Sequence, residues 1–258
     1  MAHRYKRALL GHLLAVYLLN ALPFLGSGRN EAPSIYVGAS AVANKISTQE
    51  IDNLLLEYTE AQLALVKLEA RNDKNHEHLY VHLPDRTIVY DASASEALQT
   101  PVWFTLTTTL AGFAQYRARN MVWVYDKWMV GDPQSTNIGY LVQDTGHHWG
   151  QQVRWEFGTL IVYNESNGAI FNEMELVSLT GSIVLGKNPQ ISTSYSLDGQ
   201  TYSQEKFISV GTIGNRQKRL AWFQQGHMRN WRIQRFRGDS DAHVSYVRLE
   251  AQIEALAY

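Results

Sequence analysis

The chain has 258 residues, of which 45% are hydrophobic and 18% charged, so it can bury one or two cores and is not a disordered polypeptide. Its formal net charge of −1 gives no overall attraction to nucleic acids or membranes. It contains no cysteine, which excludes disulfides and thiolate metal sites and is compatible with a reducing cytoplasm.

Residues 1–32 form an apolar leader. Arg4, Lys6 and Arg7 precede a mostly apolar run that ends near Gly26. This order of basic, apolar and small residues is typical of an export signal. Two alternatives stay open, namely a helix buried in the folded protein and an extra leader produced by an unusual gene start.

Residues 33–62 predict one strand and one helix. The apolar segment 34–37 favours a short strand, and Ser47 with Glu50 fits a capping box, in which each side chain satisfies a free amide at a helix start. Four apolar residues then fall on one helical face: Ile51, Leu54, Leu55 and Tyr58. This is the one clearly signalled helix outside the leader.

Residues 63–174 contain a repeat. Three similar heptads, "DRTIVYD", "DKWMVGD" and "NGAIFNE", begin at Asp85, Asp126 and Asn167, and each follows another apolar segment. Each copy predicts a hairpin, with turns at Pro84-Asp85, Tyr125-Asp126 and Asn167-Gly168. The three heptads begin 41 residues apart. Hairpin units repeated about every 40–45 residues are typical of β-propeller blades. A chance match of short, degenerate heptads is the alternative.

Residues 175–258 predict short antiparallel strands, as in a sheet or sandwich domain. The fold expected for the whole chain is therefore mainly β, with partial propeller-like blades followed by this C-terminal antiparallel domain and one short helical region near the N-terminus.

The segment "SYSLDGQTY" resembles the Asp-box of sialidases, S-x-D-x-G-x-T-W, but it lacks one residue between Asp198 and Gly199 and ends in Tyr202. An Asp-Gly pair favours a tight turn with positive φ at the glycine. A glycosidase also needs two carboxylates converging on one bond, and the sequence offers no such pair. We expect Asp198 and Gly199 to be a structural turn.

Residues 216–237 concentrate positive charge without any acid. The seven basic residues are Arg216, Lys218, Arg219, Arg229, Arg232, Arg235 and Arg237. Period-two alternation places Trp231 and Arg235 on one strand face and Arg232 on the other. One hypothesis is a basic sheet that contacts DNA phosphates. The alternatives are a solvated face, and arginines that pair with Glu and Asp at a subunit contact.

His76, His78 and His82 fall on one strand face, and His147 adjoins His148. No Asp or Glu at diagnostic spacing accompanies them, so we predict no metal site. The sequence has no phosphate-binding glycine loop, nucleophile elbow or HExxH motif, so we also predict no cofactor and no enzymatic activity.

Four segments of the chain are "KISTQEID", "LYVHLPDRTIVYD", "YSLDGQTYSQEKFISVGTIGNRQKRLAWFQQGHMRNWRIQRFRG" and the closing "LEAQIEAL". They resemble the packaged-DNA stabilisation proteins of short-tailed bacteriophages, which are also called tail accessory factors, hub proteins or nozzle proteins. The resemblance runs from about Pro33 to Tyr258 and concerns the C-terminal half of these longer proteins. A shortened prophage gene with a new start would explain this difference and the leader.

The resemblance implies a virion tail protein, assembled in the host cytoplasm, that forms a ring, hexameric by analogy, below the portal. It implies closure of the portal channel after packaging, retention of packaged DNA until genome ejection, and docking to the portal adaptor, tail needle and tailspikes. Two other functions stay open: a carbohydrate-binding or glycosidase-like β-protein, and an exported or envelope-associated β-protein.

Overall fold

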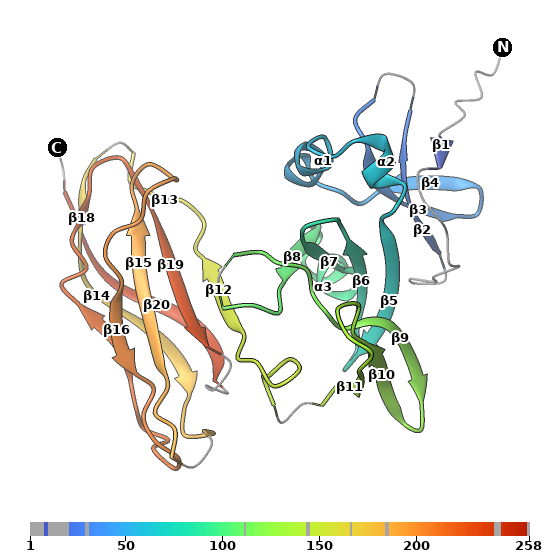
Figure 1. Ribbon diagram of the computed structural model, residues 1–258. Coiled ribbons are helices and arrows are strands. Elements are labelled where there is room, and N and C mark those ends of the chain that lie inside the picture. The colour runs from blue at the N-terminus through green and yellow to red at the C-terminus, as the bar shows by residue number, and fades with distance from the viewer. Residues whose placement is uncertain are drawn as a thin grey trace. The chain divides into compact units, whose positions relative to one another are not determined.

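A computed structural model of the chain describes residues 8–9, 21–28, 31–110, 112–142, 145–165, 167–183, 186–239 and 244–256 (Figure 1). It divides into two compact, mainly β units, residues 1–141 and 142–258. The sequence predicts a boundary between residues 174 and 175, but that position lies inside β14 (Ala169–Leu179). The whole of β14 belongs to the second unit, because it pairs with three other strands there.

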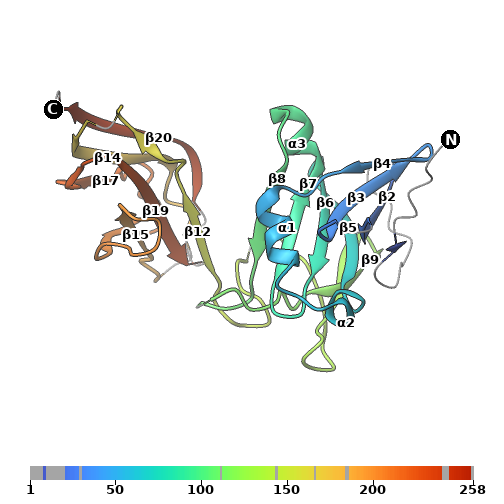
Figure 2. The same cartoon turned by 90° about the horizontal axis from the view of Figure 1, so that it is seen from above.

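The described part of the first unit contains three antiparallel sheets, in each of which neighbouring strands follow one another in sequence. Their strands are β1 (Ala8–Leu9), β2 (Leu22–Ser27), β3 (Ser34–Ala39) and β4 (Val42–Lys45); β5 (Lys67–Asp73), β6 (His76–His82), β7 (Thr87–Asp91) and β8 (Val102–Leu106); and β9 (Arg119–Val124), β10 (Lys127–Gly131) and β11 (Ile138–Tyr140). Figure 2 shows β5 to β8 side by side as one twisted sheet.

Apolar residues from the sheets of β1–β4 and β5–β8, from the three helices and from nearby loops form one core. It contains Leu25, Ile35, Leu55, Leu63, Val66, Leu79, Val81, Leu83, Ile88 and Ala92. Leu25 comes from β2, so this part of the expected leader is a strand of the folded unit, paired with β3, and not a helix. Residues 1–7 and 10–20 lie outside the described residues, and the export signal stays a prediction. Where the structure describes the chain, no helix has the length and apolar character needed to cross a bilayer.

The expected helix forms as α1 (Gln49–Leu55), but its cap differs from the prediction. Thr48 is the N-cap and accepts a hydrogen bond from the Ile51 amide, at 3.4 Å. Ser47 instead donates to buried Asp52, at 2.6 Å, and accepts from the Ile35 amide. The expected apolar face is confirmed, since its four residues contact the first core. Two further short helices, α2 (Glu60–Leu63) and α3 (Ala92–Leu98), were not predicted.

Two of the three predicted hairpins form. β6 pairs with β7, and β9 pairs with β10 through a two-residue turn in which Tyr125 and Asp126 both have positive φ. The third prediction is wrong. β13 (Val162–Tyr163) pairs with β19 (Trp231–Asp239), whereas β14 pairs with strands of a different sheet. The turn before Gly168 therefore carries the chain from one sheet to another.

The described residues of the second unit form two antiparallel sheets. One contains β12 (Arg154–Gly158), β19, β15 (Gln190–Ser196) and β16 (Lys206–Ser209), with β13 on β19. The other contains β17 (Leu220–Phe223), β14, β18 (His227–Met228) and β20 (Ser245–Ala255). Ile191 and Phe236 of the first sheet pack with Leu176 and Trp222 of the second in one core, as in a β-sandwich.

Candidate functional site

Most of the basic residues singled out in the sequence lie on or near β19. Burial alternates along this strand, with Arg232, Gln234 and Phe236 facing the core and Trp231, Ile233, Arg235 and Arg237 on the other face. The predicted division of the strand into two faces is therefore confirmed. Its orientation could not be read from the sequence, because each face carries arginine and apolar residues alike.

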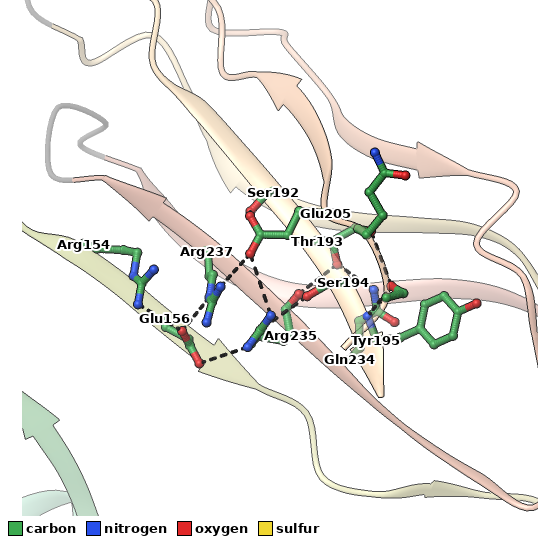
Figure 3. A network of polar contacts seen from close by, with 12 residues as sticks. Arg154, Glu156, Ser192, Thr193, Ser194, Tyr195, Glu205, Gln234, Arg235 and Arg237 are labelled. Atoms are coloured by element: carbon green, nitrogen blue, oxygen red, sulfur yellow. Dashed lines mark hydrogen bonds and ion pairs between the residues drawn. The ribbon is translucent and has the colours of Figure 1, made fainter. Parts of the chain in front are cut away.

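Arg235 and Arg237 belong to an ion-pair network on the outward face of the sheet (Figure 3). We use the name ion-pair network for Arg154, Glu156, Glu205, Arg235 and Arg237. Arg237 donates from Nε to Glu156 on β12, at 2.6 Å, and from Nη1 to Glu205, also at 2.6 Å. Arg235 lies 3.7 Å from Glu205 and 4.0 Å from Glu156.

Neutral groups hold this network in place. Ser192 donates to Glu205 Oε2, at 3.0 Å, and Arg235 Nε donates to Ser194 Oγ, at 3.2 Å. The Arg235 guanidinium also lies 3.5 Å from the centre of the Tyr202 ring. Three arginines face two glutamates, so most of the positive charge is already compensated within the chain.

Arg232 is fully buried, which excludes it as a residue that faces DNA. Its guanidinium donates to the Gln225 carbonyl, at 2.7 Å, and twice to Gln234 Oε1, at 2.7 and 3.0 Å. It lies 3.9 Å from the ring centre of Tyr195 and 4.3 Å from that of Phe171. Burial lowers its pKa to about 10, so the group is still charged at neutral pH. Arg232 therefore acts as a structural residue of the sandwich.

Arg219 pairs with acids of another strand. It donates to Glu175, at 3.0 and 3.1 Å, and to Glu173, at 2.8 Å, both on β14. The hydrogen bond to Glu175 is the main cause of the raised pKa of Arg219. Arg216, Lys218 and Arg229 are exposed, and their side chains form no ion pair with the described residues. These three are the basic residues left available for a partner.

The sequence therefore predicted the position of the basic residues and missed their acidic partners. Glu156, Glu173, Glu175 and Glu205 all lie outside the basic segment and meet it only through strand pairing. Arg219, Arg235 and Arg237 pair with acids of this chain, so the hypothesis of pairing across a subunit contact stays a prediction.

The predicted structural turn forms at Asp198 and Gly199. The Asp198 carboxylate accepts hydrogen bonds from the amides of Gln200 and Thr201, at 2.9 and 2.7 Å, and from the hydroxyls of Thr201 and Ser196. These donors, led by the Thr201 hydroxyl, hold the pKa of Asp198 well below its usual range. Every oxygen of the carboxylate is thus used inside the loop.

We expect Gly199→Val to lower the free energy of unfolding of the second unit by about 1–3 kcal/mol, because Gly199 has a φ of +75° that a β-branched residue adopts only with strain. Gly199→Asn is the matched control and should lose much less, since asparagine tolerates this region. Calorimetric melting of both variants measures the difference. Equal losses would show that backbone strain is not the cause.

An exposed apolar strip covers one face of the sheet of β9, β10 and β11. It consists of Val122, Val124, Ile138 and Tyr140, which are 36% to 75% exposed. Val122 and Tyr140 both lie opposite Met129, which places the two strands' apolar residues on the same face. Lys127 lies opposite Val124 on this face, with its Nζ 4.3 Å from the centre of the Tyr140 ring. Exposed apolar residues gathered on one face are typical of protein–protein contacts.

The histidine strand β6 carries one fully buried ring. His82 Nδ1 lies 3.1 Å from Thr87 Oγ1, and Nε2 lies 3.6 Å from Glu69 Oε2. Burial lowers the pKa of His82, although nearby Glu69 opposes this effect. The ring is therefore neutral in the folded chain at neutral pH.

We expect the melting temperature of the first unit to fall as pH drops below about 6.5, because the unfolded chain then binds a proton that folded His82 resists. The loss should approach about 1.4 kcal/mol per pH unit for this group. Calorimetry between pH 7 and 5 measures it. His82→Gln should reduce the slope without removing it, because burial also lowers the pKa of His78 in this unit. Exposed His227→Gln should leave the slope unchanged. An identical slope in all three proteins would contradict this assignment.

Comparison with known proteins connects both units to one family. A family model described as "Bacteriophage P22 Gp10, beta-propeller" matches residues 9–146, and one described as "Bacteriophage P22 Gp10, beta-sandwich" matches residues 154–254. The chain belongs to the P22 Gp10 family. The first match begins at residue 9, so the similarity to the family includes most of residues 1–32, which the sequence predicts to be a separate leader.

A curated P22 Gp10 relative, "Tail hub protein gp10" of Salmonella phage P22, is 28% identical over 206 residues. The alignment covers 80% of this chain but 42% of that protein, so the chain spans less than half the length of this relative.

Two solved structures of exo-beta-1,3-galactanase from Phanerochaete chrysosporium are also similar, at 9% and 10% identity, covering 93% of this chain and 68% of theirs. Their TM-scores of 0.24 and 0.20 are too low to support any conclusion about this P22 Gp10 family member.

Proposed function

We propose that this chain is a structural component of a phage tail hub that helps to close the portal channel, retain packaged DNA and dock other tail components. The observation that carries the proposal is the family match over both units, propeller and sandwich, together with the named relative, a tail hub protein. The chain acts in the virion tail after assembly in the host cytoplasm.

The surfaces of the described residues suit a role in assembly. The apolar strip gives the first unit an exposed face that loses water contact favourably on association. On the second unit, the charges of the ion-pair network are largely compensated, which suits contact with another protein better than contact with a polyanion. We propose that a neighbouring copy covers the apolar strip in a ring, and that the portal adaptor, tail needle and tailspikes occupy other faces.

We propose that packaged DNA is contacted by basic residues that have no acidic partner among the described residues. Arg216 and Lys218 lie in the exposed loop before β17, without ion pairs to the described residues. Loop cations that form sequence-independent phosphate contacts hold DNA while still allowing it to slide during ejection. The earlier candidates Arg232, Arg235 and Arg237 are occupied within the chain and are not proposed for DNA.

We expect the Arg216→Gln, Lys218→Gln double variant to reduce the salt dependence of binding to double-stranded DNA by about 0.9 in log–log slope for each lost contact. Arg248→Gln is the control, since Arg248 is exposed but paired with Glu250. Fluorescence anisotropy at several salt concentrations measures the slopes. Equal slopes for the double variant and the unmodified chain would show that Arg216 and Lys218 do not contact DNA.

We propose no catalytic activity. Asp198, the acid in the sialidase-like motif, uses its oxygens to hold its own loop. The alternative of a carbohydrate-binding or glycosidase-like protein predicts sugar binding or turnover by the purified chain. Saturable release of a sugar that Asp198→Asn abolishes would favour that alternative over a structural role.

The function is tested by a stop codon early in this gene, in a host that produces the phage particles. We expect heads that package DNA and then lose it, because the channel is not closed, and recovery when the chain is supplied from a plasmid. Full, infectious particles formed without the chain would overturn the proposed function.

A further inference from the structure

Three side chains with metal-binding groups meet on one face of the sheet of β5 to β8. His76 and His78 are two residues apart on β6, so they share a face. Asp91, the last residue of β7, lies opposite His78 in the strand register. One ligand atom from each residue falls within 4.8 Å of the other two.

The distances are close to those of a metal site. His76 Nδ1 lies 2.7 Å from Asp91 Oδ2, and His78 Nε2 lies 3.4 Å from the same oxygen. A tetrahedral zinc ion with bonds of about 2.0–2.1 Å keeps its ligand atoms about 3.3 Å apart. His76 and Asp91 now contact each other directly, so these two side chains must move apart to admit an ion between them.

The surroundings orient two of the three groups. Asp91 Oδ1 accepts a hydrogen bond from the Ala94 amide at the start of α3, at 2.9 Å, which leaves Oδ2 directed toward the histidines. His78 is largely buried beside the edge of the Phe104 ring. A metal ion binds the neutral form of an imidazole, whose unprotonated nitrogen supplies the lone pair. His76 is about half exposed, which gives an ion access from solvent.

One nearby cation opposes metal binding, and its charge is compensated. Arg71 on β5 lies opposite His78, but its guanidinium donates to Asp73 Oδ2, at 2.6 Å. Asp73 in turn lies opposite His76. The charged groups that face the two histidines are therefore two carboxylates, Asp73 and Asp91, and one guanidinium, Arg71.

Contrary to the expectation from sequence spacing, we propose that His76, His78 and Asp91, which strand pairing brings together, bind one divalent transition-metal ion of the zinc class. Two imidazoles and one carboxylate suit Zn²⁺, Co²⁺ or Ni²⁺, and they do not supply the all-oxygen shell that Mg²⁺ and Ca²⁺ prefer. Three protein ligands leave a fourth position for water. Such an ion ties β6 to β7 at the start of α3, within the first unit.

The test is calorimetric titration of the metal-free, untagged full chain with ZnCl₂, with MgCl₂ for comparison. We expect one saturable Zn²⁺ site per chain. His76→Gln should weaken binding by at least about tenfold, since loss of even an outer-shell partner has that effect. His227→Gln, which removes an exposed histidine of the second unit, is the matched control and should leave the affinity unchanged.

Asp91→Asn is the second variant, because asparagine also caps a helix and has nearly the same volume. Circular dichroism shows whether each variant is folded. If His76→Gln does not fold, the Zn²⁺ affinity of Asp91→Asn is the deciding measurement. Weaker Zn²⁺ binding in the folded ligand variants, with an unchanged His227→Gln, supports the site. Absence of saturable Zn²⁺ binding, or unchanged affinity in the folded ligand variants, overturns the proposal.

Discussion

Arg232→Ala should lower the free energy of unfolding of the second unit by about 3–5 kcal/mol. The change opens a cavity between the Phe171 and Tyr195 rings, which now lie against the guanidinium. It also leaves the Gln225 carbonyl and Gln234 Oε1 buried without their donor. Unsatisfied buried acceptors and a cavity both destabilise, and here they occur together.

Arg229→Ala is the control, because Arg229 is three residues away, exposed, and forms no ion pair with the described residues. It should change the free energy of unfolding by no more than about 0.5 kcal/mol. Arg232→Met separates the two causes, since methionine fills most of the space but donates no hydrogen bond. Denaturant unfolding of the second unit measures all three variants. A loss of less than about 1 kcal/mol for Arg232→Ala would show that Arg232 is not a core residue.

If a neighbouring copy covers the apolar strip, as proposed, the Val122→Lys, Ile138→Lys double variant should weaken self-association by roughly 10–100-fold, since each change places a charge in that contact. Both residues are more than half exposed, so the isolated chain accommodates lysine without loss of stability. Native mass spectrometry across a range of protein concentrations measures the oligomer and the monomer.

Val247→Lys is the matched control, because Val247 is 70% exposed on β20 in the second unit. It should leave the oligomer distribution unchanged. If the double variant assembles as well as the unmodified chain, the apolar strip does not contact a neighbouring copy.

Local patterns predicted much of the fold. Alternating residues predicted strand faces in β19, and the pairs at Tyr125-Asp126 and Asp198-Gly199 predicted turns that need positive φ. These features depend on a few neighbouring residues, which is why sequence reasoning reached them. The third hairpin failed because a strand–turn–strand pattern does not distinguish a hairpin from a connection between two sheets.

The candidate site was less accessible to sequence reasoning. Arg237 meets Glu156, and His78 meets Asp91, only because strands pair in a particular register. The inward position of Arg232 depends on a polar pocket assembled from β14, β15 and β19. A buried arginine breaks the rule that charged residues face solvent, so burial in this strand could not be read from residue type.

The tail role is tested most directly by immunogold electron microscopy of purified phage particles, with antibodies raised against this chain. We predict label at the single vertex that carries the tail, and peptides of the chain in the digested particles. Full, infectious particles that carry neither label nor peptides, while the chain remains in the host lysate, would contradict the assignment to the tail.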